Sequence, residues 1–142
     1  MATVAAVLDA CVLYPAQLRD FFLSLAAADL FRPKWSAMIH EEWITSLLAN
    51  RTDLKRTDLE VLRARMNQIF PDATVQGFET LIPMLVLPDA DDRHVLAAAI
   101  HSRADGTTSR RRRCYPTALQ PSRQTCSQTT CWISTKMRHF RR

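Results

Sequence analysis

The sequence predicts an α/β sandwich built around a parallel sheet, and two observations point to this class. Short apolar runs of strand length alternate along the chain with longer segments that carry apolar residues at helical spacing. The first run, residues 3–8, is mostly apolar and ends at Asp9, as is typical of a strand buried on both faces. Ligands of such sheets bind at the carboxyl ends of the strands, so we expect the functional site there.

A first helix is expected to begin near Pro15. Its core stripe has the spacing i, i+3, i+4, i+7 and consists of Leu18, Phe21, Phe22 and Leu25. Residues 30–35 form a second strand candidate, in which Pro33 predicts an edge strand or a strand end. Ser36 then has the identity and position of an N-cap for a helix that runs through Leu48.

Two more helices and one more strand are expected after this. Residues 57–60 match a capping box, and the helix that follows should end at Phe70, before a proline. The apolar stripe of that helix consists of Leu62, Met66 and Ile69. Residues 84–87, a brief apolar run between two prolines, form the third strand candidate. A last helix is expected from Arg93 to about Arg103, capped by an aspartate that precedes it.

Charge divides the chain in two. All fourteen acidic residues lie within residues 1–105, whereas residues 106–142 carry nine Lys or Arg and no acid. A folded surface normally mixes both signs, so the break predicts a domain of residues 1–105 followed by a basic tail of low order, residues 106–142. The formal net charge of +5 is therefore owed to the tail and does not by itself indicate that the domain binds nucleic acid.

Composition argues against several classes of protein. A hydrophobic content of 47% is not that of a disordered chain, and no apolar run reaches the roughly 18 residues of a membrane span. Residues 1–9 lack the basic start and cleavage pattern of a signal peptide, which favours a cytoplasmic protein. The spacing of Cys114, Cys126 and Cys131 fits no standard zinc site, and a cytoplasmic chain is not expected to carry a disulfide framework.

Acidic residues stand at three places that the predicted fold would bring to one crevice. Asp9 ends the first strand, Glu42 lies in the second helix, and Asp89, Asp91 and Asp92 precede the last helix. Converging carboxylates are what Mg²⁺ or Mn²⁺ needs in order to bind and to act on a phosphodiester. Each position also has a structural interpretation: a turn at Asp9, a solvated helix position at Glu42, and helix caps for the other three.

Three parts of the chain carry a family resemblance. Residues 7–15 have the sequence Val-Leu-Asp-Ala-Cys-Val-Leu-Tyr-Pro, and residues 87–99 begin Leu-Pro-Asp-Ala-Asp-Asp-Arg-His-Val-Leu. Between them stand the pairs Trp35-Ser36 and Glu42-Trp43. Together these segments resemble bacterial PIN-domain ribonucleases; the resemblance covers about residues 3–105, and the last motif is the most specific. The resemblance implies a three-layer α/β/α sandwich and a metal-dependent endoribonuclease that hydrolyses RNA phosphodiesters with Mg²⁺ or Mn²⁺.

The resemblance also implies roles for particular residues. Asp9, Glu42 and Asp92 match the catalytic metal carboxylates of the family, with Asp91 and then Asp89 as fallback positions for the third. Many such proteins are toxins held by a cognate antitoxin, and many are dimers, which implies an antitoxin and a second copy as partners beside RNA.

Two other residues near these acids have predictable environments. The family often has Asn two residues after the first aspartate, where this chain has Cys11, so a small polar support is expected to be absent. Cys11 and His94 are both expected to be packing residues, because no arrangement of nucleophile and base is legible in the sequence.

The tail departs from the family, which continues with a strand, an acidic loop that supplies a fourth carboxylate, and a final strand. No acid follows Asp105, so the last strands are expected to be lacking. Our hypothesis is that a frameshift produced this composition. Codons that join the third base of Cys131 to the first two bases of Trp132 must encode Leu, and those that join Trp132 to Ile133 must encode Asp.

Two alternatives stay open at this point. The first is that the arginines of residues 110–113 form a nucleic-acid arm that gains affinity by releasing counterions. The second is that the whole chain is a non-catalytic remnant that binds RNA or a partner protein.

Overall fold

A four-stranded parallel sheet organises residues 3–108, which are the residues that the computed structural model describes. The strands are β1 (Ala5–Leu8), β2 (Arg32–Ser36), β3 (Thr74–Val75) and β4 (Gly106–Thr108). Their order in the sheet is β3-β2-β1-β4, and every neighbouring pair is parallel. The α/β class and the first two strands predicted from the sequence are therefore confirmed.

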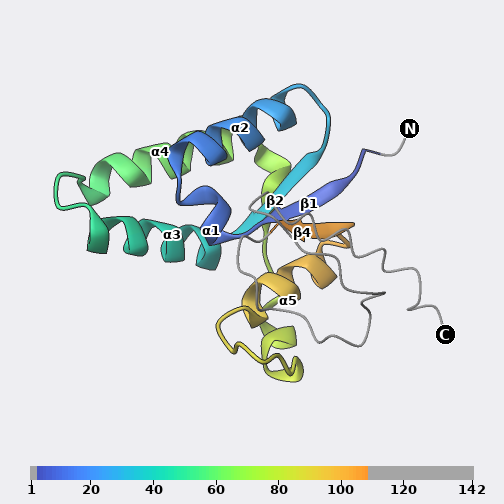
Figure 1. The fold of residues 1–142 in the computed structure, drawn as a ribbon. Helices are drawn as coiled ribbons and strands as arrows, with labels where there is room; N and C mark the ends of the chain where they lie inside the picture. The colour runs from blue at the N-terminus through green and yellow to red at the C-terminus, as the bar shows by residue number, and fades with distance from the viewer. Residues whose placement is uncertain (1–2, 109–142) are drawn as a thin grey trace, which may run out of the picture.

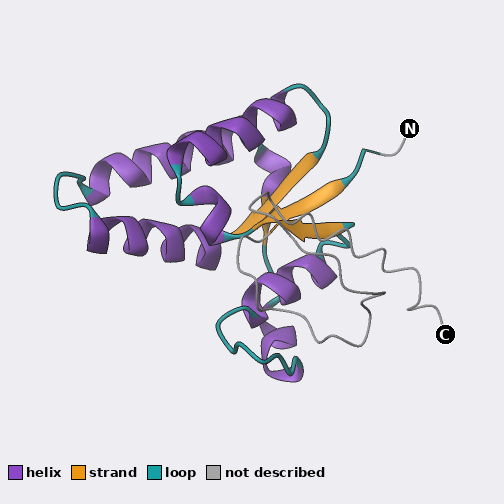
Figure 2. Ribbon diagram, in the orientation of Figure 1, coloured by secondary structure: helices purple, strands orange, loops and turns teal. Residues whose placement is uncertain are grey.

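Helices lie on both sides of this sheet. The α-helices are α1 (Ala10–Leu13), α2 (Ala16–Ala27), α3 (Ala37–Asn50), α4 (Arg56–Ile69) and α5 (Arg93–His101), and two 3₁₀ helices are η1 (Pro71–Ala73) and η2 (Glu79–Met84). Figure 1 shows α2 and α5 on opposite sides of the sheet, with α3 and α4 as an antiparallel pair beyond the carboxyl end of β1. The same view coloured by secondary structure is compatible with a three-layer sandwich (Figure 2). None of the helices in residues 3–108 is long and apolar enough to cross a membrane.

Local sequence sets the start of α3 but not that of α4. The Ser36 side-chain oxygen accepts a hydrogen bond from the Ile39 N–H at 3.3 Å, which confirms the predicted N-cap. The capping box at residues 57–60 is wrong, because α4 already begins at Arg56. Arg56, the first residue of α4, instead donates to the Glu41 carboxylate of α3 at 2.6 Å. The start of α4 is therefore held by a contact with another helix and not by a local cap.

The remaining boundaries of these helices agree with the sequence. Phe70 ends α4 as expected, and α5 begins at Arg93 and ends within two residues of the predicted position. The predicted core stripes are only partly right: Met66 of α4 is buried, but Ile69 of α4 and Phe21 of α2 are 66% and 55% exposed.

The third predicted strand is also wrong. Residues 84–87 form no strand: Met84 and Val86 are 74% and 91% exposed, whereas Leu85 is half-buried and packs against the cluster that contains Val75 and Phe78. Thr74–Val75 pairs with β2 instead, so β2 is an inner strand, and of the two predictions from Pro33 the strand end is right and the edge strand is wrong. Pro33 is tolerated there because β3 is so short that it pairs with β2 only at Trp35 and Ser36.

A strand does follow Asp105, contrary to expectation. β4 pairs in parallel with β1, and the Asp105 carboxylate accepts a hydrogen bond from the Ala5 N–H at 2.8 Å. The Thr108 hydroxyl donates to the Val7 carbonyl at 3.3 Å. The sheet therefore extends past the charge break at residue 105, to Thr108 at least.

The other expectations for the tail lie outside the described residues. These are the low order of residues 109–142, the cysteine spacing, the arginine run at 110–113 and the shifted codons near Trp132.

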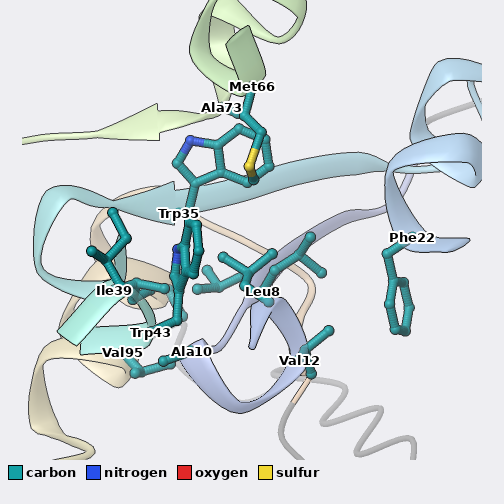
Figure 3. Packing of buried hydrophobic residues seen from close by; sticks show 14 of the residues in the cluster. Leu8, Ala10, Val12, Phe22, Trp35, Ile39, Trp43, Met66, Ala73 and Val95 are labelled. Atoms are coloured by element: carbon teal, nitrogen blue, oxygen red, sulfur yellow. The ribbon is translucent and has the colours of Figure 1, made fainter. Parts of the chain in front are cut away.

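A core of large side chains joins both helical layers to the sheet. Trp35, Ile39 and Trp43 are each 0% exposed and lie in one cluster with Leu8 of β1 (Figure 3). Val95 of α5 belongs to the same cluster, which holds the beginning of α5 against the carboxyl end of β1. This packing fixes the positions of the acidic residues that precede α5.

Candidate functional site

Asp9 occupies the carboxyl end of β1, an inner strand of the sheet, and is only 4% exposed. Its backbone N–H donates to the Thr108 carbonyl at 3.2 Å, so β4 fixes its position. Its carboxylate Oδ1 accepts from the Ala10 N–H at 2.7 Å and thereby caps α1. The structural interpretation of Asp9 as the start of a turn is thus correct. A carboxylate accepts about four hydrogen bonds, so this role does not exclude a ligand.

Cys11 supports the same carboxylate. Its thiol donates to Asp9 Oδ2 at 3.0 Å. The expectation that a small polar support is absent is therefore wrong, because a thiol takes the place of the amide that the family often has. Cys11 is also only half-buried, so it is not a pure packing residue.

Glu42 projects from α3 toward the beginning of α5, where it meets His94. The Glu42 Oε2 and His94 Nε2 atoms lie 3.4 Å apart, an ion-pair distance rather than that of a well-aligned hydrogen bond. The side chains are 31% and 11% exposed, so Glu42 is not the fully solvated helix position that was the alternative. His94 is the functional candidate that the sequence analysis missed.

The three aspartates before α5 have different environments. Asp89 accepts from the Asp91 N–H at 3.1 Å and shapes the turn, and Asp91 is exposed. Asp92 is half-buried and holds the N-cap position of α5, but its side chain makes no capping hydrogen bond. Helix capping therefore explains where Asp92 lies in the chain, but it does not explain the role of the Asp92 carboxylate.

The pKa of His94 reports the negative charge at this edge of the sheet. Burial by itself lowers the pKa of His94, yet its pKa is raised overall, because Glu42, the Asp91 backbone and the charge of Asp9 together outweigh burial. Two carboxylates, Asp9 at the end of β1 and Glu42 of α3, and one backbone group of the segment before α5 therefore act on one imidazole. The only signal for this in the sequence is that His94 stands two residues after the acidic pair Asp91-Asp92.

The donor types at this edge fit a hard divalent cation, since Mg²⁺ and Mn²⁺ prefer carboxylate oxygens. Within residues 3–108, however, no group of three or more His, Cys, Asp or Glu side chains is arranged closely enough to hold a metal ion. The site thus has donors of suitable chemistry on neighbouring elements without the geometry of a three-ligand centre.

A hollow of about 270 Å³ opens beside these residues, between α1 and α3. Cys11 and Glu42 both line it, so it adjoins the carboxylates directly. Comparisons of the chain with protein-family models, with curated proteins and with solved structures find no match. The resemblance to PIN-domain ribonucleases therefore rests on the sequence motifs alone.

Proposed function

We propose that this chain is a metal-dependent endoribonuclease of the PIN type, which hydrolyses RNA phosphodiesters. One observation carries the proposal: a buried carboxylate at the end of an inner parallel strand, Asp9, shares its edge of the sheet with Glu42 and with the acidic residues before α5. In parallel sheets this edge is where ligands bind.

The chain's own residues have distinct tasks in this proposal. Asp9, Glu42 and Asp92, with Asp91 as the fallback for the third, would hold Mg²⁺ or Mn²⁺. A bound divalent ion supplies positive charge that stabilises the charge developing on the phosphodiester. Cys11 and the β4 backbone orient Asp9, and His94 orients Glu42 through their 3.4 Å contact.

Further parts of the proposal rest on the resemblance and on the sequence pattern. They are a cytoplasmic toxin that is held by a cognate antitoxin, a homodimer, and an activity reduced by an altered C-terminal sequence. Genomic DNA across codons 100–142 tests the last of these. The frameshift hypothesis fails if no alternative reading frame there encodes a β-strand and an acidic loop.

Glu42 and its neighbour Glu41 provide a matched test of the activity. Glu41 is exposed and pairs with Arg56, whereas Glu42 faces His94. We expect Glu42→Gln to lower the rate of RNA cleavage in Mg²⁺ by at least about 100-fold, because even outer-shell groups of metal sites contribute about 10–100-fold. Glu41→Gln should cleave like the wild type, and EDTA should abolish cleavage by both.

The alternative function is a non-catalytic remnant that binds RNA or a partner. Equal cleavage by the Glu41→Gln and Glu42→Gln variants would contradict the proposed site. No metal-dependent cleavage by the wild type, together with retained RNA binding, would support the remnant.

A further inference from the structure

The hollow between α1 and α3 has a composition unlike that of the acidic edge beside it. Tyr14, the residue that ends α1, forms part of one wall, and Trp43 and Ser46 of α3 form part of another. Tyr14 and Ser46 both line the hollow and are both partly exposed. Cys11, whose thiol lies 3.0 Å from Asp9 Oδ2, joins the hollow to the candidate site.

Size and charge restrict what this hollow can bind. A volume of about 270 Å³ lies at the small end of ligand pockets, which run to about 300–1,000 Å³, so it admits one flat ring system and little more. Glu42 is the one charged residue among those that line it within residues 3–108, and it repels a phosphate. An uncharged aromatic ring suits this lining, because Tyr14 contributes an aromatic side chain and Ser46 a hydroxyl that can bond a polar edge.

The wall formed by Trp43 is rigid. The Trp43 Nε1–H donates to His40 Nδ1 at 3.1 Å, and the Arg19 guanidinium lies 5.4 Å from the centre of the Trp43 ring. Arg19 in turn donates to the Leu13 carbonyl at 3.1 Å and so ties α2 to α1. The hollow is therefore bounded by elements that other contacts hold in place.

We propose that this hollow binds one nucleobase of the RNA substrate, next to the phosphodiester at Asp9, with the base stacked on Tyr14. This inference rests on the proposed function, since it identifies how a single-stranded RNA would lie at that site. Recognition of unpaired RNA bases by stacking on aromatic side chains is the usual mode for such substrates.

Binding of RNA in EDTA tests the base site apart from cleavage. The probe is a fluorescent 12-nucleotide single-stranded RNA of mixed sequence, measured by anisotropy with the full chain. Tyr14→Ala should weaken binding roughly 5- to 150-fold, the range for loss of one stacked base, and Tyr14→Phe should bind like the wild type. Ser46→Trp should weaken binding by filling the hollow, whereas Phe21→Ala, which removes an exposed ring on α2, should not.

A series of RNAs that each lack one base sharpens the test. One RNA of the series should lack the base that stacks on Tyr14. The wild type and Tyr14→Ala should bind that RNA with equal affinity, because the stacking contact is already absent. Unchanged RNA binding by both Tyr14→Ala and Ser46→Trp would overturn the base site, as would an absence of RNA binding by the wild type. If Ser46→Trp then disrupted a dimer, the hollow would be a protein contact.

Cleavage in Mg²⁺ separates this inference from the proposed function. Binding that depends on Tyr14 without cleavage by the wild type would leave the base site standing and contradict the nuclease. If the wild type cleaves RNA but substitutions of Tyr14 and Ser46 leave RNA binding unchanged, the base site is contradicted and the nuclease is not.

Discussion

At the scale of single residues, the carboxylate of Asp9 depends on a thiol. Cys11 Sγ donates to Asp9 Oδ2 at 3.0 Å, while the Ala10 N–H holds the other oxygen at 2.7 Å. From the sequence alone, Asp9 was expected to lack a hydrogen-bond donor at position 11. The family pattern has Asn there, and the absence of its amide is visible in the sequence, whereas the hydrogen bond from the Cys11 thiol is not. A thiol is a weak donor, but it is placed correctly.

Substitutions of Cys11 test this role. Cys11→Ala removes the donor, and we expect RNA cleavage to fall roughly threefold to tenfold, in line with the net contribution of one hydrogen bond. Cys11→Ser should restore cleavage, since a hydroxyl donates from nearly the same position. Equal cleavage rates for the Ala and Ser variants, at equal thermal stability, would show that the thiol contact does not matter.

His40 is a second residue whose protonation state the structure specifies. It is 1% exposed, and its Nδ1 accepts from Trp43 Nε1, which requires an unprotonated Nδ1. Within the described residues its Nε2 has no hydrogen-bond partner. Burial, and then the charge of Arg63, lower the pKa of His40 to about 4, partly opposed by the nearby Asn67 amide. The folded protein therefore keeps His40 neutral in mildly acidic solution.

The stability of the protein should depend on pH through His40. The unfolded chain takes up a proton near pH 6.5 and the folded chain only near pH 4, so the contribution of His40 to stability is complete above about pH 6.5 and declines as the pH falls toward 4. Between pH 7 and 4 the wild type should lose about 3 kcal/mol more than a His40→Gln variant, measured by denaturant unfolding. Parallel pH profiles for the two proteins would contradict this.

At the scale of elements, local signals predicted most helix boundaries but failed at the start of α4 and where the strands are short. Ser36 carries its own cap, so the start of α3 was predictable. β3 has only two residues, Thr74 and Val75, and exists because β2 offers it a partner. The apolar run at residues 84–87 looked like a strand but forms none, and only Leu85 of the run packs against a buried cluster. Hydrophobicity in so short a segment does not distinguish a strand from a loop.

Ser36 provides a direct measure of how far local capping stabilises α3. Ser36→Ala removes the acceptor for the Ile39 N–H, and we expect the free energy of unfolding to fall by about 1 kcal/mol. Ser24→Ala is the matched control, because its hydroxyl bonds the Asp20 carbonyl on the exposed side of α2 and should change stability by less than about 0.5 kcal/mol. Similar losses for both variants, in equilibrium denaturation, would mean that the cap adds nothing.

At the scale of the whole molecule, the topology explains both what the sequence predicted about the site and what it missed. The predicted class places the carboxyl end of β1 at the ligand-binding edge of the sheet, and Asp9 and Glu42 do both act on His94 there; that Asp92 joins them in one site stays a prediction. The contact of His94 with Glu42 depends on how α5 packs on the core through Val95, which no local pattern encodes. The charge break at residue 105 misplaced the end of the sheet, because Asp105 and β4 are held by β1 across about a hundred residues of sequence.

The most direct measurement of the central claim is the single-turnover rate of RNA cleavage by the wild type and by Asp9→Asn, with and without Mg²⁺. Asn keeps an oxygen that can cap α1, so the variant should fold while losing the charge. We predict Mg²⁺-dependent cleavage by the wild type, at least about 100-fold slower cleavage by Asp9→Asn, and an unchanged rate for the exposed control Asp20→Asn. Cleavage by Asp9→Asn at the wild-type rate, or none by a folded wild type in Mg²⁺, would contradict the account.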